Sequence, residues 1–346
     1  MMPGTRHKRA MHISAGRQAL QLAAEGRSKE ALAYLQKHAR DGDSEALFVR
    51  GLWQIEGKLL ARNLPQARND LAAAAGNGSR EAARILAGLV ATGAGGAADW
   101  SKAIEMLHRW SNLDPIARRQ HDLIAAMYLN EEGKPTSLVD GRVLSEAPEV
   151  VRFTGLFSAD ECDFLREVAG QRFKPALIFH EAKRQFVKDP IRDSDTASFP
   201  LVFEWPAVYA LNRRIAAASD TQVEQGEPLQ LLRYRPGQQY RPHLDAIAGL
   251  ENQRILTFIV WLNDDYAGGE THFPETGLSV RGAKGDALMF RNALPDGRPD
   301  PVSRHAGLPV TDGEKLIASR WIRKRPPTGP HEAFGPHEAE QAGQRD

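Results

Sequence analysis

Residues 240–245 read YRPHLD, and residues 305–323 read HAGLPVTDGEKLIASRWIR. The first segment places His243 and Asp245 at positions i and i+2, so both side chains point to the same side of an extended backbone. The second begins with His305 and runs into residues 315–323, a short and mostly apolar stretch that follows a turn containing glycine. Such a stretch is typical of a strand. The two segments predict a strand-rich domain that carries ionisable side chains.

Other stretches support this interpretation. Short apolar or alternating runs, bounded by Gly, Pro, Asn and Asp, occupy Leu229–Tyr234, Arg254–Leu262 and Ala287–Phe290. Upstream, a strand-like run from Val150 is followed by Ser158, a helix N-cap candidate, and by an amphipathic stretch from Ala159 to Gly170. The pattern favours a barrel or sandwich with a flanking helix.

Taken alone, the pair His243 and Asp245 is weak evidence for a metal site, because an H-x-D sequence is usually an ordinary surface or capping pair. His305 follows 60 residues after Asp245, where a barrel can return a third ligand to the same site. Two imidazoles and one carboxylate leave three positions of a metal open, the arrangement that suits iron(II) oxygen chemistry. A structural zinc site would instead close all four positions.

Lys315 lies ten residues beyond His305, and strand alternation places Ile317, Ser319 and Trp321 on the same face. A lysine that points into a barrel needs a partner, because an unpartnered buried ammonium is costly. A dicarboxylate such as 2-oxoglutarate would supply it. One end would chelate the metal and the distal carboxylate would pair with the lysine.

The first third of the chain repeats itself. Ala31, Ala67 and Ala103 follow one another at intervals of 36 residues, and Leu35, Leu71 and Leu107 keep the same interval. Helix-like runs surround these positions, and the pattern resembles the short tetratricopeptide-like (Sel-type) repeats. Such hairpins stack because none buries its apolar face alone. They either bind a protein partner on a concave surface or serve as a rigid cap or dimerisation element for the neighbouring domain.

Composition sets further limits. The chain has 346 residues, 45 Lys and Arg against 44 Asp and Glu, and one cysteine, Cys162. Because the charges nearly balance, no strong net electrostatic field attracts the protein to nucleic acid or an anionic membrane. The single cysteine excludes an internal disulfide and a multi-Cys zinc site. No stretch is long and apolar enough for a membrane span. We expect a cytoplasmic protein without nucleic-acid or membrane partners.

The expected organisation has two domains, an all-α helical repeat followed by a mainly-β domain with flanking helices. Helical hairpins are expected over residues 15–125, a linker over 126–144 and the mainly-β domain over 145–326. Residues 327–346, rich in Pro, Gly, Glu and Gln, are expected to form a disordered tail.

Four segments of the second domain together resemble the prolyl 4-hydroxylase family of 2-oxoglutarate/Fe(II)-dependent dioxygenases. They are YRPGQQYRPHLD from Tyr234, RILTFIVWLNDDYAGGETHFP from Arg254, KGDALMF from Lys284 and HAGLPVTDGEKLIASRW from His305. The resemblance covers roughly residues 145–326 and rests on ligand order, on the ten-residue spacing from histidine to lysine and on several turn residues. It implies a double-stranded β-helix, or jelly-roll, core.

The resemblance also implies roles for individual residues. Fe²⁺ would be bound by His243, Asp245 and His305. The cosubstrate 2-oxoglutarate would be held by Lys315, Tyr234 and Thr271. The resemblance places four further residues near the substrate: Tyr240, Arg254, Trp321 and Arg192. The implied reaction uses O₂ to hydroxylate a C–H bond, most readily of a prolyl residue in a peptide or protein, and releases succinate and CO₂, with ascorbate as a candidate reductant.

Alternatives remain at this point. Tyr234 and Trp321 have an ordinary interpretation as core aromatics, and Arg254 and Arg192 as surface charges. Ala246 stands where many relatives carry an aromatic residue, which leaves a non-prolyl amino acid or small metabolite open as substrate. A second alternative belongs to a different functional class, in which the repeats bind a protein and the barrel is catalytically silent or acts as a sensor. A metal-dependent hydrolase is a third, although it would not need the lysine at this spacing.

Overall fold

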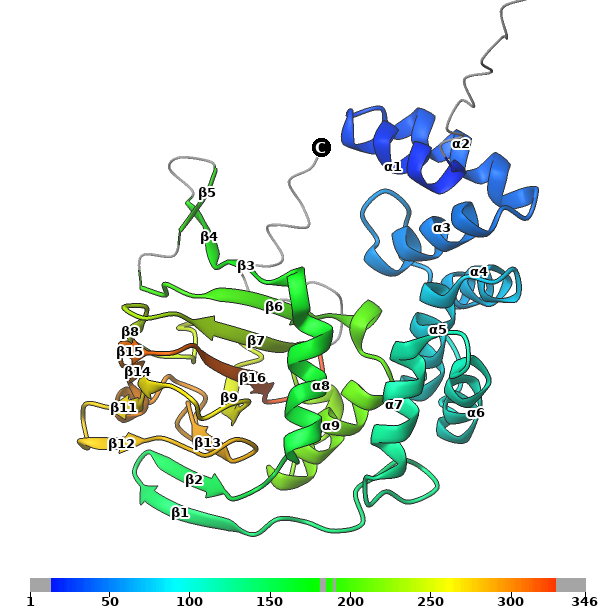
Figure 1. Ribbon diagram of the computed structural model, residues 1–346. Helices are drawn as coiled ribbons and strands as arrows, with labels where there is room; N and C mark the ends of the chain where they lie inside the picture. The colour runs from blue at the N-terminus through cyan, green and yellow to red at the C-terminus, as the bar shows by residue number, and fades with distance from the viewer. Residues whose placement is uncertain (1–13, 181–184, 189–190, 328–346) are drawn as a thin grey trace, which may run out of the picture. The chain divides into compact units, whose positions relative to one another are not determined.

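The computed structural model describes residues 14–180, 185–188 and 191–327 (Figure 1). Apart from residue 327, the expected disordered tail lies outside the described residues. The chain divides into two compact units, Met1–Ala98 and Asp99–Asp346. The sequence places the end of the helical hairpins at residue 125, whereas this division groups the last two helices of that region with the strand-rich unit.

The first unit is helical. Its helices are α1 (Ala15–Ala24), α2 (Ser28–Arg40), α3 (Ser44–Glu56), α4 (Leu64–Gly76) and α5 (Arg80–Thr92). The side chains of Asp43, Asn63 and Ser79 cap α3, α4 and α5 by accepting from backbone N–H groups of the first turn. Gly51 on α3 lies against Leu71 on α4, where a Cβ atom would come within 3.0 Å of the leucine side chain. The small residue therefore permits the close helix approach.

The repeated residues occupy equivalent places. Ala31 and Ala67 are each the fourth residue of their helix, and each is fully buried. Ala103, in the second unit, is the fourth residue of α6 (Trp100–Trp110) and is also fully buried. The 36-residue interval thus corresponds to a constant position in every second helix, α2, α4 and α6.

The second unit contains helices α6, α7 (Pro115–Ala125), α8 (Ala159–Ala169) and α9 (Pro206–Ala218). Its longer strands are β1 (Gly141–Glu146), β2 (Glu149–Phe153), β6 (Asp195–Phe199), β7 (Leu229–Tyr234), β9 (Arg254–Trp261), β13 (Ala287–Arg291) and β16 (Lys315–Arg323). Its shorter strands are β3 (Lys174–Pro175), β4 (Leu177–His180), β5 (Gln185–Lys188), β8 (Tyr240–His243), β10 (Ala267–Gly268), β11 (Thr271–Phe273), β12 (Leu278–Val280), β14 (His305–Gly307) and β15 (Val310–Asp312).

Two antiparallel sheets form the body of this unit (Figure 1). The larger has eight strands in the order β1-β2-β13-β9-β16-β7-β6-β3, and the smaller has four in the order β12-β11-β14-β8. A buried core joins them, since Phe273 and Val280 of the smaller sheet belong to the same apolar cluster as Leu232, Ile259 and Ile317 of the larger. The mainly-β domain with flanking helices expected from the sequence is therefore present as a two-sheet sandwich.

Two helices pack on the larger sheet. The Cys162 thiol on α8 contacts the carbonyl oxygen of Trp261 on β9, and the Arg320 guanidinium on β16 donates to the carbonyl oxygen of Asn212 on α9. Helix α8 begins after Ser158 with a capping box completed by Glu161, as the sequence predicts for this N-cap. Every helix of the described residues is too short or too polar to cross a bilayer.

Candidate functional site

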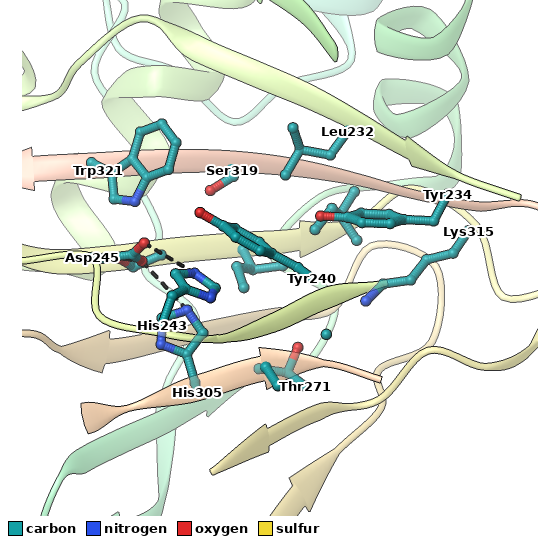
Figure 2. Close-up of a pocket in the computed structure, with 15 residues that line it drawn as sticks. Leu232, Tyr234, Tyr240, His243, Asp245, Thr271, His305, Lys315, Ser319 and Trp321 are labelled. Atoms are coloured by element: carbon teal, nitrogen blue, oxygen red, sulfur yellow. Dashed lines mark hydrogen bonds and ion pairs between the residues drawn. The ribbon is translucent and has the colours of Figure 1, made fainter. Parts of the chain in front are cut away.

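His243, Asp245 and His305 lie together at neighbouring strands of the smaller sheet. His243 ends β8 and His305 begins β14, and the two residues face each other in the antiparallel register. Asp245 follows two residues after His243. The Nε2 atoms of His243 and His305 lie 3.5 and 3.6 Å from the two carboxylate oxygens of Asp245, and Figure 2 shows the three side chains converging.

Backbone carbonyl groups orient both imidazole rings. The Nδ1 atom of His243 lies 2.8 Å from the carbonyl oxygen of Arg241, and that of His305 lies 3.0 Å from the carbonyl oxygen of Ser303. Because a carbonyl oxygen only accepts, each Nδ1 carries the hydrogen and each Nε2 presents a lone pair. This is the tautomer that a metal-binding histidine needs.

The charges of the three groups also suit a cation. Burial lowers the pKa of His305 to about 4, so the ring is neutral at pH 7. Burial would raise the pKa of Asp245, but His305, His243 and the Thr257 hydroxyl together lower it below its usual range. The site thus offers a neutral imidazole at His305 and an ionised carboxylate at Asp245.

The residues present fit a divalent metal ion. One ligand atom from each lies within 4.8 Å of the others, and these three form the one group of this kind among the described residues. The Nε2 atom of His243 is buried and has no hydrogen-bond partner within the described part of the chain. A bound metal would satisfy this atom, which otherwise carries the cost of a buried unpaired acceptor.

Lys315 lies elsewhere in the same cavity, which measures about 420 Å³ including its open mouth. Its side chain is 3% exposed, and Nζ donates to the carbonyl oxygen of Gly269 over 2.6 Å and lies 5.5 Å from the ring centre of Tyr234. Burial lowers the pKa of Lys315 to about 8. Neither of these contacts carries a negative charge, so an anionic ligand would offset the cost of burying the ammonium.

Most of the residues that the sequence singles out line this cavity. They are His243, Asp245, His305, Lys315, Tyr234, Thr271, Tyr240 and Trp321. The Tyr240 ring stacks on His243 with centroids 3.4 Å apart. Ile317 and Ser319 line the cavity too, as the alternation along β16 predicts.

The two arginines predicted near the substrate do not line the cavity themselves. The Arg254 guanidinium lies 4.2 Å from the ring centre of Trp321 and forms two hydrogen bonds of 2.7 Å with Glu227. The Arg192 guanidinium lies 5.7 Å from the ring centre of Tyr240. Both arginines therefore contact an aromatic residue of the cavity wall.

Sequence reasoning missed several residues of the site. Leu232, Thr257, Ile259, Ala306 and Gly307 line the cavity, and Asn292 lies behind it with its amide on the Thr257 hydroxyl. Alternation could have found Leu232, which shares a strand face with Tyr234. Nothing in the local sequence marks Asn292, because its partner is 35 residues away.

Comparison with known proteins identifies the class. The family model described as the 2OG-Fe(II) oxygenase superfamily matches residues 229–323, which include the triad and Lys315. Prolyl 4-hydroxylase 1 of Arabidopsis thaliana is 34% identical over 206 residues, covering 54% of this chain and 73% of that protein. The chain therefore belongs to the prolyl 4-hydroxylase family. It is a dioxygenase that depends on Fe²⁺, 2-oxoglutarate and O₂.

Other relatives match a smaller share of their own length. Prolyl 4-hydroxylase subunit alpha-1 of Homo sapiens is 30% identical over 232 residues, covering 64% of this chain and 43% of that subunit, and the Gallus gallus subunit is 32% identical over 234 residues, with 64% and 45% covered. The chain thus spans less than half of these vertebrate subunits. Among solved structures, the viral collagen prolyl hydroxylase vCPH from Paramecium Bursaria Chlorella virus-1 is 28% identical, with a TM-score of 0.40, 50% of this chain and 95% of that chain covered.

Proposed function

We propose that the chain hydroxylates a prolyl residue in a peptide or protein and releases succinate and CO₂. The observation that supports this best is one cavity that combines the His243, Asp245 and His305 triad, a buried cation and an aromatic wall. The names of its relatives support the same substrate class. Prolyl 4-hydroxylases from a plant and from vertebrates are about equally similar to this chain.

Each group has a role in this proposal. His243, Asp245 and His305 would hold Fe²⁺, which supplies O₂ activation and the oxidative decarboxylation of 2-oxoglutarate when bound. Lys315 would pair with the distal carboxylate of the cosubstrate as a charge-assisted hydrogen bond, with Tyr234 and Thr271 beside it. The apolar side chains of the wall would exclude water from the reacting atoms.

Trp321 and Tyr240 suit a prolyl ring on the substrate side. Both line the cavity, and the Arg254 guanidinium packs on the Trp321 ring. The Trp321 indole N–H is buried and has no hydrogen-bond partner among the described residues. A neutral, apolar prolyl ring would pack against the aromatic face while the indole N–H donates to a peptide carbonyl oxygen.

The test is turnover by the Fe²⁺-reconstituted protein with a substrate panel. The panel holds a proline-rich peptide, the same peptide with alanine in place of proline, free proline and other free amino acids. Succinate release and the peptide mass are measured together. We expect the proline-containing peptide alone to gain one oxygen atom. Trp321→Phe, which keeps the aromatic face and removes the N–H, should raise KM for the peptide more than KM for 2-oxoglutarate.

Other results would favour one of the alternative functions. Oxidation of a free amino acid but not of the peptide would indicate the same chemistry on a small substrate. Iron-loaded protein that consumes no 2-oxoglutarate with any substrate would contradict the proposal, and would favour a silent barrel or a hydrolase. Ascorbate added to the assay tests its role as a reductant.

We further propose that the helical hairpins are Sel-type repeats that bind a protein partner. The constant position of the buried alanines in α2, α4 and α6 supports the repeat. A polar pocket supports the partner, since it is lined by residues of α2, α3 and α4 that include Arg40 and Gln54. Gln54 is 8% exposed, and its Oε1 atom has no partner in the described part of the chain.

If the partner is the protein substrate, Arg40→Glu should raise KM for a protein substrate and leave KM for a short peptide unchanged. Equal KM values for wild type and variant with both substrates would favour a rigid cap. For the strand-rich unit we propose the double-stranded β-helix of the family, which the two antiparallel sheets support. A cytoplasmic location also remains a proposal.

A further inference from the structure

A chain of buried hydrogen bonds ends on the carboxylate of Asp245. The Thr257 hydroxyl donates to Oδ2 of Asp245 over 2.5 Å, and Nδ2 of Asn292 donates to the Thr257 hydroxyl over 2.8 Å. Thr257 and Asn292 are 1% and 0% exposed. Thr257 lies on β9 and Asn292 directly follows β13, which is the neighbour of β9 in the larger sheet. The chain therefore links the larger sheet to the triad.

The direction of each hydrogen bond is fixed by the carboxylate. Ionised Asp245 only accepts, so the Thr257 hydroxyl must donate its single hydrogen to it. The hydroxyl oxygen can then only accept a hydrogen bond from Asn292. The group of Asn292 that faces it must therefore be the NH₂ group and not the side-chain carbonyl oxygen. Consistent with this orientation, Oδ1 of Asn292 is left without a partner among the described residues. Leaving a buried acceptor without a hydrogen bond is costly. The need to pair buried polar groups therefore does not by itself explain why Asn292 takes this orientation.

Asn292 also contacts the segment that carries His305. Its backbone carbonyl oxygen accepts from the Asp300 N–H over 2.9 Å, and the Asp300 carbonyl oxygen accepts from the Ser303 hydroxyl over 2.7 Å. The carbonyl oxygen of Ser303 in turn accepts from Nδ1 of His305 over 3.0 Å. Asn292 thus connects to Asp245 through its side chain and to His305 through its backbone. Two of the three candidate ligands share one buried residue behind them.

We propose that Thr257 and Asn292 are positioning residues that hold Asp245 as a ligand through one oxygen. The inference rests on the proposed metal site. Because Oδ2 accepts from Thr257, Oδ1, which lies 3.5 Å from Nε2 of His243, would be the oxygen that remains available to a bound metal. A carboxylate that binds through one oxygen would leave more of the metal's positions to other ligands. A carboxylate that is free to rotate can take a second position with its other oxygen.

The test measures metal affinity directly, by titrating the metal-free protein with Mn²⁺ under anaerobic conditions. Thr257→Val, which keeps the shape and removes the hydroxyl, should weaken Mn²⁺ binding by about 10- to 100-fold, as is typical when a group that orients a ligand is lost. Thr257→Ser should restore most of the affinity. Asn292→Asp presents only acceptors, draws the hydroxyl hydrogen away from Asp245, and should weaken binding as well.

The matched control is Thr196→Val on β6. This change also removes a buried hydroxyl of the larger sheet, but that hydroxyl has no partner in the described residues and does not line the cavity. Its Mn²⁺ affinity should equal that of wild type. In the double variant Thr257→Val/Asn292→Asp, the second change should add little, because both act through one hydrogen bond.

Two controls separate this inference from the proposed site itself. His243→Ala should abolish Mn²⁺ binding, and if it does not, the proposed metal site is wrong. If His243→Ala abolishes binding while folded Thr257→Val keeps wild-type affinity, the positioning role alone is overturned. If Thr257→Val does not fold, Asn292→Ala, which retains the hydroxyl, decides the question by the same affinity measurement. In Fe²⁺-loaded protein, a shifted charge-transfer band of bound 2-oxoglutarate in Thr257→Val would further support the role.

Discussion

Raising the pH should weaken the binding of 2-oxoglutarate through Lys315. The pKa of this buried lysine is lowered from 10.5 to about 8, because burial disfavours the charged form. In the proposed site, only the charged form of Lys315 would pair with the distal carboxylate of 2-oxoglutarate. Since the apparent affinity scales with the binding-competent fraction, the dissociation constant should be nearly constant below pH 7 and about tenfold higher at pH 9.

The same shift predicts a stability effect with a defined sign. The folded-state pKa of Lys315 lies below its unfolded value, so the buried ammonium destabilises the cosubstrate-free fold at pH values below about 8. The cost is about 3 kcal/mol at 1.36 kcal/mol for each pKa unit, and it disappears as the pH rises from 8 to 10.5. Bound 2-oxoglutarate should raise this pKa again, so binding at pH 9 should take up nearly one proton.

Calorimetric titration of Mn²⁺-loaded protein with 2-oxoglutarate at pH 7, 8 and 9 measures both effects. Repeating it in buffers of different ionisation enthalpy gives the proton uptake. Lys315→Arg is the matched control, because a guanidinium stays charged throughout this range and should give a nearly flat profile. Wild-type affinity that is independent of pH, or that falls in parallel with that of Lys315→Arg, would refute the reasoning.

Three further predictions concern other sites. Glu227→Gln should lower the free energy of unfolding by about 3–5 kcal/mol in urea titrations, since Glu227 pairs with the buried guanidinium groups of Arg254 and Arg323; an unchanged midpoint would contradict this. Gly282→Ala should destabilise by about 1–3 kcal/mol, because its Cβ atom would lie within 2.2 Å of the Trp261 ring, whereas Gly76→Ala, with nothing within 4 Å of its Cβ, should not destabilise. A chelator should lower the melting temperature of the metal-loaded protein and leave His243→Ala unchanged, because the ion stabilises only the state that binds it.

Much of the strand-rich unit could be predicted from the sequence. The runs at residues 229–234 and 315–323 coincide with β7 and β16, and the predicted N-cap at Ser158 is confirmed. These signals are local, since apolar alternation and a capping residue act within a few positions. The cofactors follow from the same local patterns, because the H-x-D pair, His305 and Lys315 each stand at recognisable spacings.

The groups that support the site could not be predicted in this way. Thr257 reads as an ordinary strand residue, and Asn292 as a turn residue after β13. Their relation to Asp245 arises only when β9 and β13 pair in the larger sheet and the segment after β8 packs against them. Glu227 likewise meets Arg254 and Arg323 from distant parts of the chain. Long-range hydrogen bonds and buried ion pairs leave no periodic signal.

Under the proposed roles of Lys315 and Trp321, the face of β16 that lines the cavity would hold the cosubstrate at one end and the substrate at the other. Lys315, Ile317, Ser319 and Trp321 all line the cavity, so a cation stands at one end of this row and an indole at the other. The two ends are six positions apart along the strand, or about 20 Å. The neighbouring strands keep the same order, because Tyr234 pairs with Lys315 and Thr257 with Trp321. A slip of one residue would turn all four side chains to the other face. The register of the central strand therefore decides both where an anion can bind and where an aromatic wall is available.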